Sequence, residues 1–142
     1  MSKPFFLRSG LAVNQFVYIN KCIKPILLPF LQTHYPQGDY VFWPDLASSH
    51  YSKFAQQEFQ SLGINYVPKH LNPANLPKSR PIEDFWGNLK DKVYEGAWFA
   101  KSLPQLRNRI AACIKKIDLQ FVQNHMVTVK KRLDYIRRYG VD

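Results

Sequence analysis

The sequence predicts an α/β protein: a parallel sheet of about three strands with crossover helices, followed by C-terminal helices. Two observations carry this prediction. Over residues 4–68, short apolar and aromatic runs alternate with segments of helical periodicity, in the order strand, helix, strand, helix, strand. From residue 81 onward, the periodic segments are all helical. Because parallel strands need crossover connections, we expect the first two helices to join the three strands in a right-handed sense.

The first strand is predicted at Pro4–Leu7, and the Arg8–Gly10 segment that follows it is typical of a turn. Asn14 is a good N-cap for a helix that continues to about Leu31. Pro25 lies inside this helix, where it removes a backbone donor, so we expect a kink there.

The second strand is predicted at Tyr40–Trp43. Ser48 or Ser49 can cap the helix that follows, and Gly63 is expected to end it. Its apolar positions are Tyr51, Phe54, Ala55, Phe59 and Leu62. A third strand is expected at Ile64–Pro68.

The Lys69–Arg80 segment is predicted to be a loop because it contains prolines and shows no periodicity. Ser79 and Pro81 favour a helix start, and this helix is expected to end near Gly96. Its apolar face is predicted to consist of Ile82, Phe85, Trp86, Leu89 and Val93.

Two more helices are predicted after Gly96. Ser102 and Gln105 have capping-box spacing at the start of the first. The second covers about residues 121–138, with apolar residues at alternating spacings of four and three. Its apolar stripe is Val122, Met126, Val129, Leu133 and Ile136, and its other face carries Lys130, Lys131, Arg132, Arg137 and Arg138.

The charge balance predicts a polyanionic partner. The 142 residues contain 20 Lys and Arg against 10 Asp and Glu, a net charge of +10. This charge favours nucleic acid over a membrane as the partner. The longest apolar stretch, Ile26–Leu31, is too short to span a bilayer. Two cysteines without a CxxC pattern fit a reducing compartment. We therefore expect an intracellular or nuclear protein.

Two carboxylates stand where function is expected. Asp45 follows a predicted buried strand, and functional residues gather at the carboxyl ends of parallel strands. Glu83 falls in the first turn of the helix that Pro81 opens. Each also has a purely structural explanation: Asp45 as a turn or capping residue, and Glu83 with Asp84 as first-turn acids favoured by the helix dipole.

Residues 43–50 (WPDLASSH) and 80–93 (RPIEDFWGNLKDKV) together resemble the catalytic domain of mariner-like transposases, whose acids form an Asp–Asp–Glu/Asp triad. Asp45 and His50 fit the second-aspartate motif, although Leu46 replaces the usual Asn. The glutamate motif matches at Pro81, Ile82, Glu83, Trp86, Leu89 and Lys90. The loop between the two motifs is longer and more basic than in many relatives.

The resemblance implies an incomplete ribonuclease-H-like fold and metal-dependent DNA cleavage and strand transfer in the nucleus. It makes Asp45 and Glu83 catalytic ligands of Mg²⁺ or Mn²⁺, with His50 as a helper. Implied partners are transposon-end and target DNA, and a second copy of the chain. Phosphate contacts are expected from Lys69, Lys78, Arg80, Lys115, Lys116, Lys130, Lys131 and Arg132.

The family's first catalytic Asp is expected to lie outside residues 1–142, with the first two strands and the upstream DNA-recognition modules. Asp39 cannot replace it, because six extended residues separate it from Asp45 by roughly 20 Å. We therefore expect a catalytic-domain portion that is inactive alone and self-associates through the unpaired edge of the Lys3–Gly10 strand. The alternatives are a non-catalytic DNA-binding or assembly module, or a structural or protein-interaction domain with a basic surface.

Overall fold

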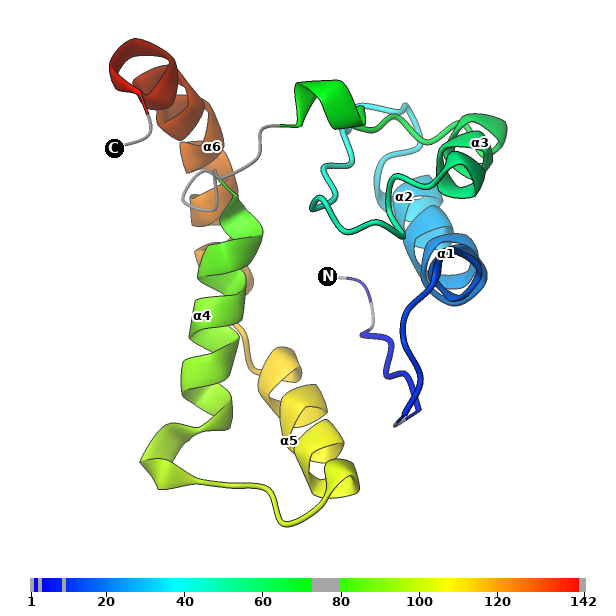
Figure 1. The fold of residues 1–142 in the computed structure, drawn as a ribbon. Coiled ribbons are helices and arrows are strands. Elements are labelled where there is room, and N and C mark those ends of the chain that lie inside the picture. The colour runs from blue at the N-terminus through cyan, green and yellow to red at the C-terminus, as the bar shows by residue number, and fades with distance from the viewer. Residues whose placement is uncertain (1, 3, 9, 73–79, 141–142) are drawn as a thin grey trace. The chain divides into compact units, whose positions relative to one another are not determined.

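The computed structural model describes residues 2, 4–8, 10–72 and 80–140. The chain divides into two compact units, Met1–Ala74 and Asn75–Asp142. Helices predominate in the described residues, and these contain no sheet (Figure 1). The α/β prediction, and with it the incomplete ribonuclease-H-like fold of three strands and crossover helices, is therefore wrong.

Two of the predicted strands meet at a single parallel bridge, between Phe42 and Tyr66. The Phe42 N–H donates to the carbonyl of Asn65 at 2.8 Å, and the Val67 N–H donates to the carbonyl of Phe42 at 2.9 Å. The next rung of a parallel ladder would need an N–H at Pro44, which proline lacks. The pairing therefore stops after one residue.

Side chains donate hydrogen bonds to the backbone carbonyls beyond this bridge. The Tyr51 hydroxyl donates to the Val67 carbonyl at 2.8 Å, and Asn72 Nδ2 donates to the Pro44 carbonyl at 2.8 Å. The predicted first strand, Pro4–Leu7, has no strand conformation. The predicted self-association required an unpaired strand edge at this segment, and the described residues do not form that edge.

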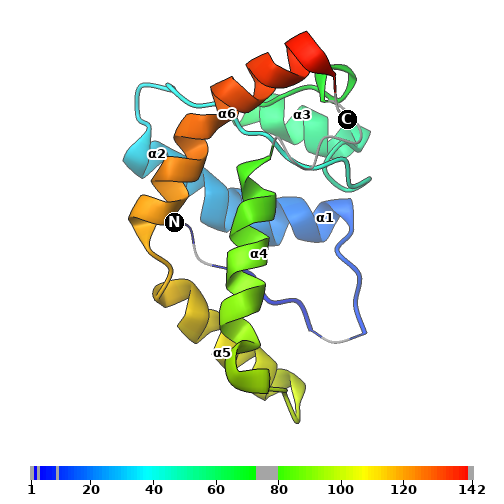
Figure 2. The ribbon, with the colours of Figure 1, turned by 90° about the vertical axis from the view of Figure 1, so that its left-hand side faces the viewer.

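The first predicted helix is a continuous run of three segments, α1 (Gln15–Val17), η1 (Tyr18–Leu27) and α2 (Leu28–His34), seen as one rod in Figure 2. Asn14 Oδ1 caps it, as predicted, by accepting from two backbone N–H groups at 2.9 and 3.0 Å. Segment η1 has π-helical i→i+5 bonding and contains Pro25. A kink was predicted at this proline, and the structure has a π-helical segment there.

Helix α3 (Lys53–Ser61) is capped by Ser52 rather than by Ser48 or Ser49, with Ser52 Oγ accepting from the Ala55 N–H at 3.1 Å. A short 3₁₀ turn, η2 (Lys69–Leu71), follows later in this unit.

The end of α3 confirms the predicted stop at Gly63, which has a φ of +66°. The Gly63 N–H donates to the Gln60 carbonyl at 3.1 Å, and the Ile64 N–H donates to the Phe59 carbonyl at 2.9 Å. These two bonds define a Schellman motif. Its apolar contact joins Phe59 and Ile64, both of which belong to the core of the first unit. That core comprises Tyr18, Ile19, Ile23, Leu31, Ala55, Phe59 and Ile64.

The second unit is built from α4 (Pro81–Val93), α5 (Leu103–Lys115) and α6 (Leu119–Tyr139), with a 3₁₀ turn, η4 (Glu95–Ala97), after α4. Helix α4 packs along both α5 and α6. The buried residues between them are Leu89, Val93, Cys113 and Ile117. The three helices predicted for this part of the sequence are therefore confirmed.

Parts of the predicted apolar stripes remain in water. On α4, Ile82 and Trp86 are 44% and 53% exposed, whereas Leu89 and Val93 are buried. On α6, Met126 is 57% exposed. Only part of each predicted apolar face is therefore buried in the core. In the described parts of the chain, no helix is both long enough and apolar enough to cross a bilayer.

Candidate functional site

Asp45 organises the loop that follows the Phe42 bridge. Its Oδ1 accepts a hydrogen bond from the Ala47 N–H at 2.9 Å and lies 2.7 Å from Nδ1 of His50. The side chain of Asp45 is 56% exposed, whereas that of His50 is 19% exposed. The carboxylate therefore forms a turn, as its structural explanation requires, and remains accessible to a ligand.

His50 stands between this carboxylate and the core. Its ring lies against Tyr18 of η1, with ring centroids 4.2 Å apart. Burial raises the pKa of the Tyr18 hydroxyl above its ordinary value, and Cys22 and Asp45 nearby raise it further. Tyr18 is therefore neutral at physiological pH and holds the imidazole through ring packing.

Asn72 fixes the position of the loop and was missed by the sequence analysis. Its Nδ2 donates to the Pro44 carbonyl at 2.8 Å and to the Tyr51 hydroxyl at 2.7 Å, while its Oδ1 accepts from Trp43 Nε1 at 2.9 Å. Asn72 is buried, and the groups it binds are 21 to 29 residues earlier in the sequence. No local signal in the sequence marks it.

Glu83 lies in the first turn of α4 and is exposed. The neighbouring Asp84 faces α6, where its Oδ2 is 2.7 Å from Nη1 of Arg132 and 4.0 Å from Nε2 of His125. The two adjacent acids thus have different surroundings: Asp84 is held between helices, and Glu83 is open to water.

The metal site stays a prediction. Asp45 belongs to the first unit and Glu83 to the second. Within residues 2–72 and 80–140, apart from Lys3 and Ser9, no three His, Cys, Asp or Glu side chains form a group that could hold a metal ion. Asp45 and Glu83 are hard oxygen donors of the kind that Mg²⁺ or Mn²⁺ prefers, so their chemistry suits such an ion.

The predicted phosphate-binding residues fall into two groups. Arg132 is half-buried in its ion pair with Asp84, so it serves the fold, and Arg80 is half-buried at the N-cap position of α4. The exposed residues are Lys69 on η2, Lys115 and Lys116 at the end of α5, and Lys130 and Lys131 on α6. Lys78 lies outside the described residues.

Arg109 is a further cation with a structural role. Its guanidinium donates to the carbonyls of Lys92 and Val93 at 3.2 Å and lies 5.4 Å from the ring centroid of Trp98. It therefore satisfies carbonyls at the C-terminal end of α4, where no intrahelical donor remains. Arg137 and Arg138 in the last turn of α6 are also exposed, and they extend the predicted set along that helix.

Comparisons of the chain with protein-family models, with curated proteins and with solved structures found no match.

Proposed function

We propose that this chain is a DNA-binding module of mariner-like transposase descent, which contacts DNA phosphates through its second unit. The observation that carries the proposal is the C-terminal half of α6. There Lys130, Lys131, Arg137 and Arg138 are all exposed within about two helical turns. Residues 75–142 contain fourteen Lys and Arg against seven Asp and Glu, so this surface belongs to a strongly basic unit.

Lysine and arginine side chains on one helix bind phosphates as they release the counterions condensed on DNA. Such binding is independent of base sequence and weakens steeply as salt rises. The transposase descent rests on the two motifs around Asp45 and Glu83 and on their order in the chain.

Fluorescence anisotropy with a labelled duplex tests the proposal. We expect tight binding at low ionic strength and a linear loss of log affinity with log salt concentration. The K130Q/K131Q variant should reduce the slope by about 2, because two phosphate contacts are removed. Lys21 and Lys53 are exposed cations of the first unit, so K21Q/K53Q is the matched control and should change the slope little. Absence of duplex binding at low salt would overturn the proposal.

A second candidate function is metal-dependent DNA cleavage and strand transfer, favoured by the exposure of both Asp45 and Glu83. By the resemblance, each residue would serve as an oxygen ligand of Mg²⁺ or Mn²⁺, and the metal would stabilise charge on the attacking and leaving oxygens. The resemblance assigns only two of the triad's three acids to residues 1–142, so these residues alone are not expected to cleave DNA.

Calorimetric titration with Mn²⁺ distinguishes this candidate from binding alone. Divalent binding that is lost in both Glu83→Gln and Asp45→Asn would support a retained site, and Asp91→Asn, an exposed acid later in α4, is the control. Identical titrations for all four proteins would remove the second candidate and leave DNA binding untouched.

A further inference from the structure

Two tyrosines lie exposed one turn apart near the end of α6. Tyr135 is 59% and Tyr139 69% exposed, and their ring centroids are 4.9 Å apart with the planes inclined at 44°. Residues four apart share one face of a helix, so the rings form a continuous aromatic surface open to water.

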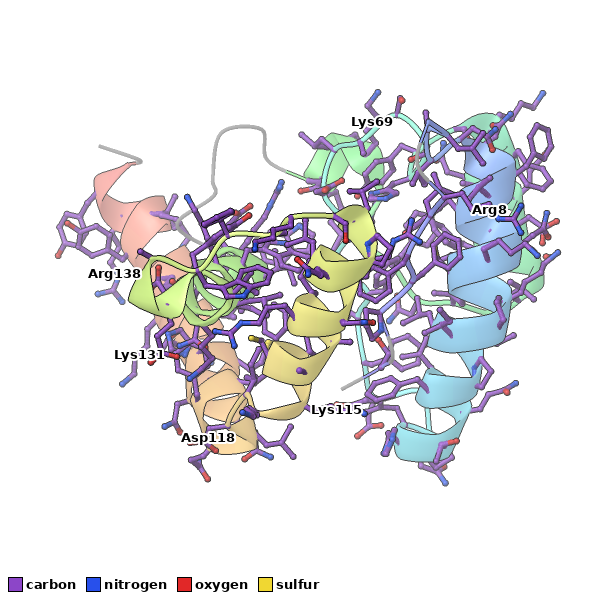
Figure 3. The ribbon with its side chains drawn as sticks, turned by 90° about the horizontal axis from the view of Figure 1, so that it is seen from below. Arg8, Lys69, Lys115, Asp118, Lys131 and Arg138 are labelled. Atoms are coloured by element: carbon purple, nitrogen blue, oxygen red, sulfur yellow. The ribbon has the colours of Figure 1, made fainter. Side chains whose placement is uncertain are left out.

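Two cations flank this aromatic surface. Lys131 precedes Tyr135 by four residues and Arg138 follows it by three, which places both on the face of the rings. Both side chains are exposed, and Figure 3 labels them on the C-terminal half of α6. We call Lys131, Tyr135, Arg138 and Tyr139 together the tyrosine face.

We propose that the tyrosine face binds single-stranded DNA, with unpaired bases stacked on Tyr135 and Tyr139 and the flanking phosphates bound by Lys131 and Arg138. This inference rests on the proposed function and specifies the form of DNA. In a duplex the faces of the bases are hidden in the stack, so protein aromatic rings cannot cover them. Single strands expose these faces, and basic surfaces that carry aromatic rings bind them without sequence preference.

The helix dipole explains only part of this arrangement. Cations in the last turn of a helix are stabilising, which accounts for Arg137 and Arg138. The dipole gives no reason for two large rings in water beside them. Stacking on a base would cover apolar ring surface while the adjacent cations neutralise the phosphates, so one ligand satisfies both features.

The test uses the full chain and a labelled oligothymidylate of about 15 nucleotides, within the site sizes known for single-strand binders. Three variants are compared: Y135A/Y139A, Y135F/Y139F, and the control Tyr94→Ala, which removes a half-exposed tyrosine at the end of α4. A second probe is an abasic oligomer of equal length, which keeps the phosphates and lacks the bases. Circular dichroism checks that each variant keeps its helical content.

We expect Y135A/Y139A to bind the oligothymidylate at least about fivefold more weakly, given the stacking contribution per base. Y135F/Y139F should bind within about twofold of wild type, because phenylalanine keeps the ring, and Tyr94→Ala should bind normally. The wild-type protein should bind the abasic oligomer as weakly as Y135A/Y139A binds oligothymidylate.

Equal binding of wild type to the abasic and thymidylate oligomers would overturn the inference, as would an equal loss of duplex affinity in Y135A/Y139A. In either case, salt-sensitive duplex binding would still support the proposed function. Failure to bind both duplex and single strand at low salt would remove both proposals.

Discussion

Nη1 of Arg132 donates a hydrogen bond to Oδ2 of Asp84 across 2.7 Å, and this ion pair joins α6 to α4. The two side chains are 27% and 35% exposed, so the pair is partly shielded from water. Arg132, which was predicted from the sequence to contact DNA phosphates, thus holds two helices of the second unit together.

A double-mutant cycle can measure this ion pair. Asp84→Asn and Arg132→Gln, alone and together, are expected to show a coupling free energy of about 1 kcal/mol in urea unfolding, the upper end for incompletely buried pairs. The control is Asp134–Arg137 on α6, whose atoms are 3.8 Å apart and whose side chains are 47% and 74% exposed. Its coupling should be near zero, and equal couplings for the two pairs would contradict the role given to Arg132.

Asn72→Ala should destabilise the first unit by roughly 2–4 kcal/mol. The substitution removes the side-chain acceptor of Trp43 Nε1 and the donor to the buried Pro44 carbonyl, and losing the partner of a buried polar group costs about 1–3 kcal/mol. Asn65→Ala is the comparison, since its Nδ2 donates to the Tyr40 carbonyl at an exposed site. It should cost less than about 1 kcal/mol. Trp43 fluorescence in a chain whose other tryptophans are replaced by phenylalanine reports the transition.

Two glycine-to-alanine substitutions should change the stability of the protein in opposite directions. Gly63→Ala forces alanine into the left-handed conformation at the end of α3, at a cost of about 1 kcal/mol. Gly87→Ala lies inside α4, where an added Cβ meets nothing within 4 Å, and should stabilise that helix by up to about 1 kcal/mol. Thermal unfolding by circular dichroism measures both, and destabilisation by Gly87→Ala would contradict the open surface assigned to it.

Alkaline pH should destabilise the first unit through Tyr18. Its pKa is raised in the folded protein, so folding holds the phenolic proton more tightly than the unfolded chain does. The contribution is complete below the unfolded pKa of about 10 and is lost as pH rises beyond it. Urea midpoints between about pH 9 and pH 11 should therefore fall less in Tyr18→Phe than in wild type. Parallel pH profiles for the two proteins would exclude this linkage.

The helices could be predicted from the sequence because their signals are local. Asn14, Ser102 and Gly63 mark helix ends through bonds to residues at most five positions away. The capping box predicted from Ser102 and Gln105 forms only in part. Gln105 Oε1 accepts from the Lys101 N–H at 2.9 Å, whereas a capping box requires it to accept from the Ser102 N–H.

The sheet could not be predicted correctly because apolar runs do not show which backbone donors are available. Tyr40–Trp43 and Ile64–Pro68 have strand composition, yet Pro44, two residues after the paired Phe42, lacks the N–H that the next rung needs. The partners of Asn72 and Asp84 are also non-local, at separations of 21 to 48 residues. Which of two adjacent acids faces a neighbouring helix depends on packing that the periodicity alone does not show.

The π-helical segment η1 changes which side chains line up along the first helix. Ile19, Ile23, Leu27 and Leu31 recur every four residues, and all four contribute to the same core. In a regular α-helix of 3.6 residues per turn, a spacing of four drifts steadily around the axis. The i→i+5 turns rotate less per residue and correct this drift. The π-helical segment that contains Pro25 thus keeps a four-residue repeat of apolar side chains on one side of the helix. Restoring regular α-helical bonding there would rotate Leu31 away from Ile19.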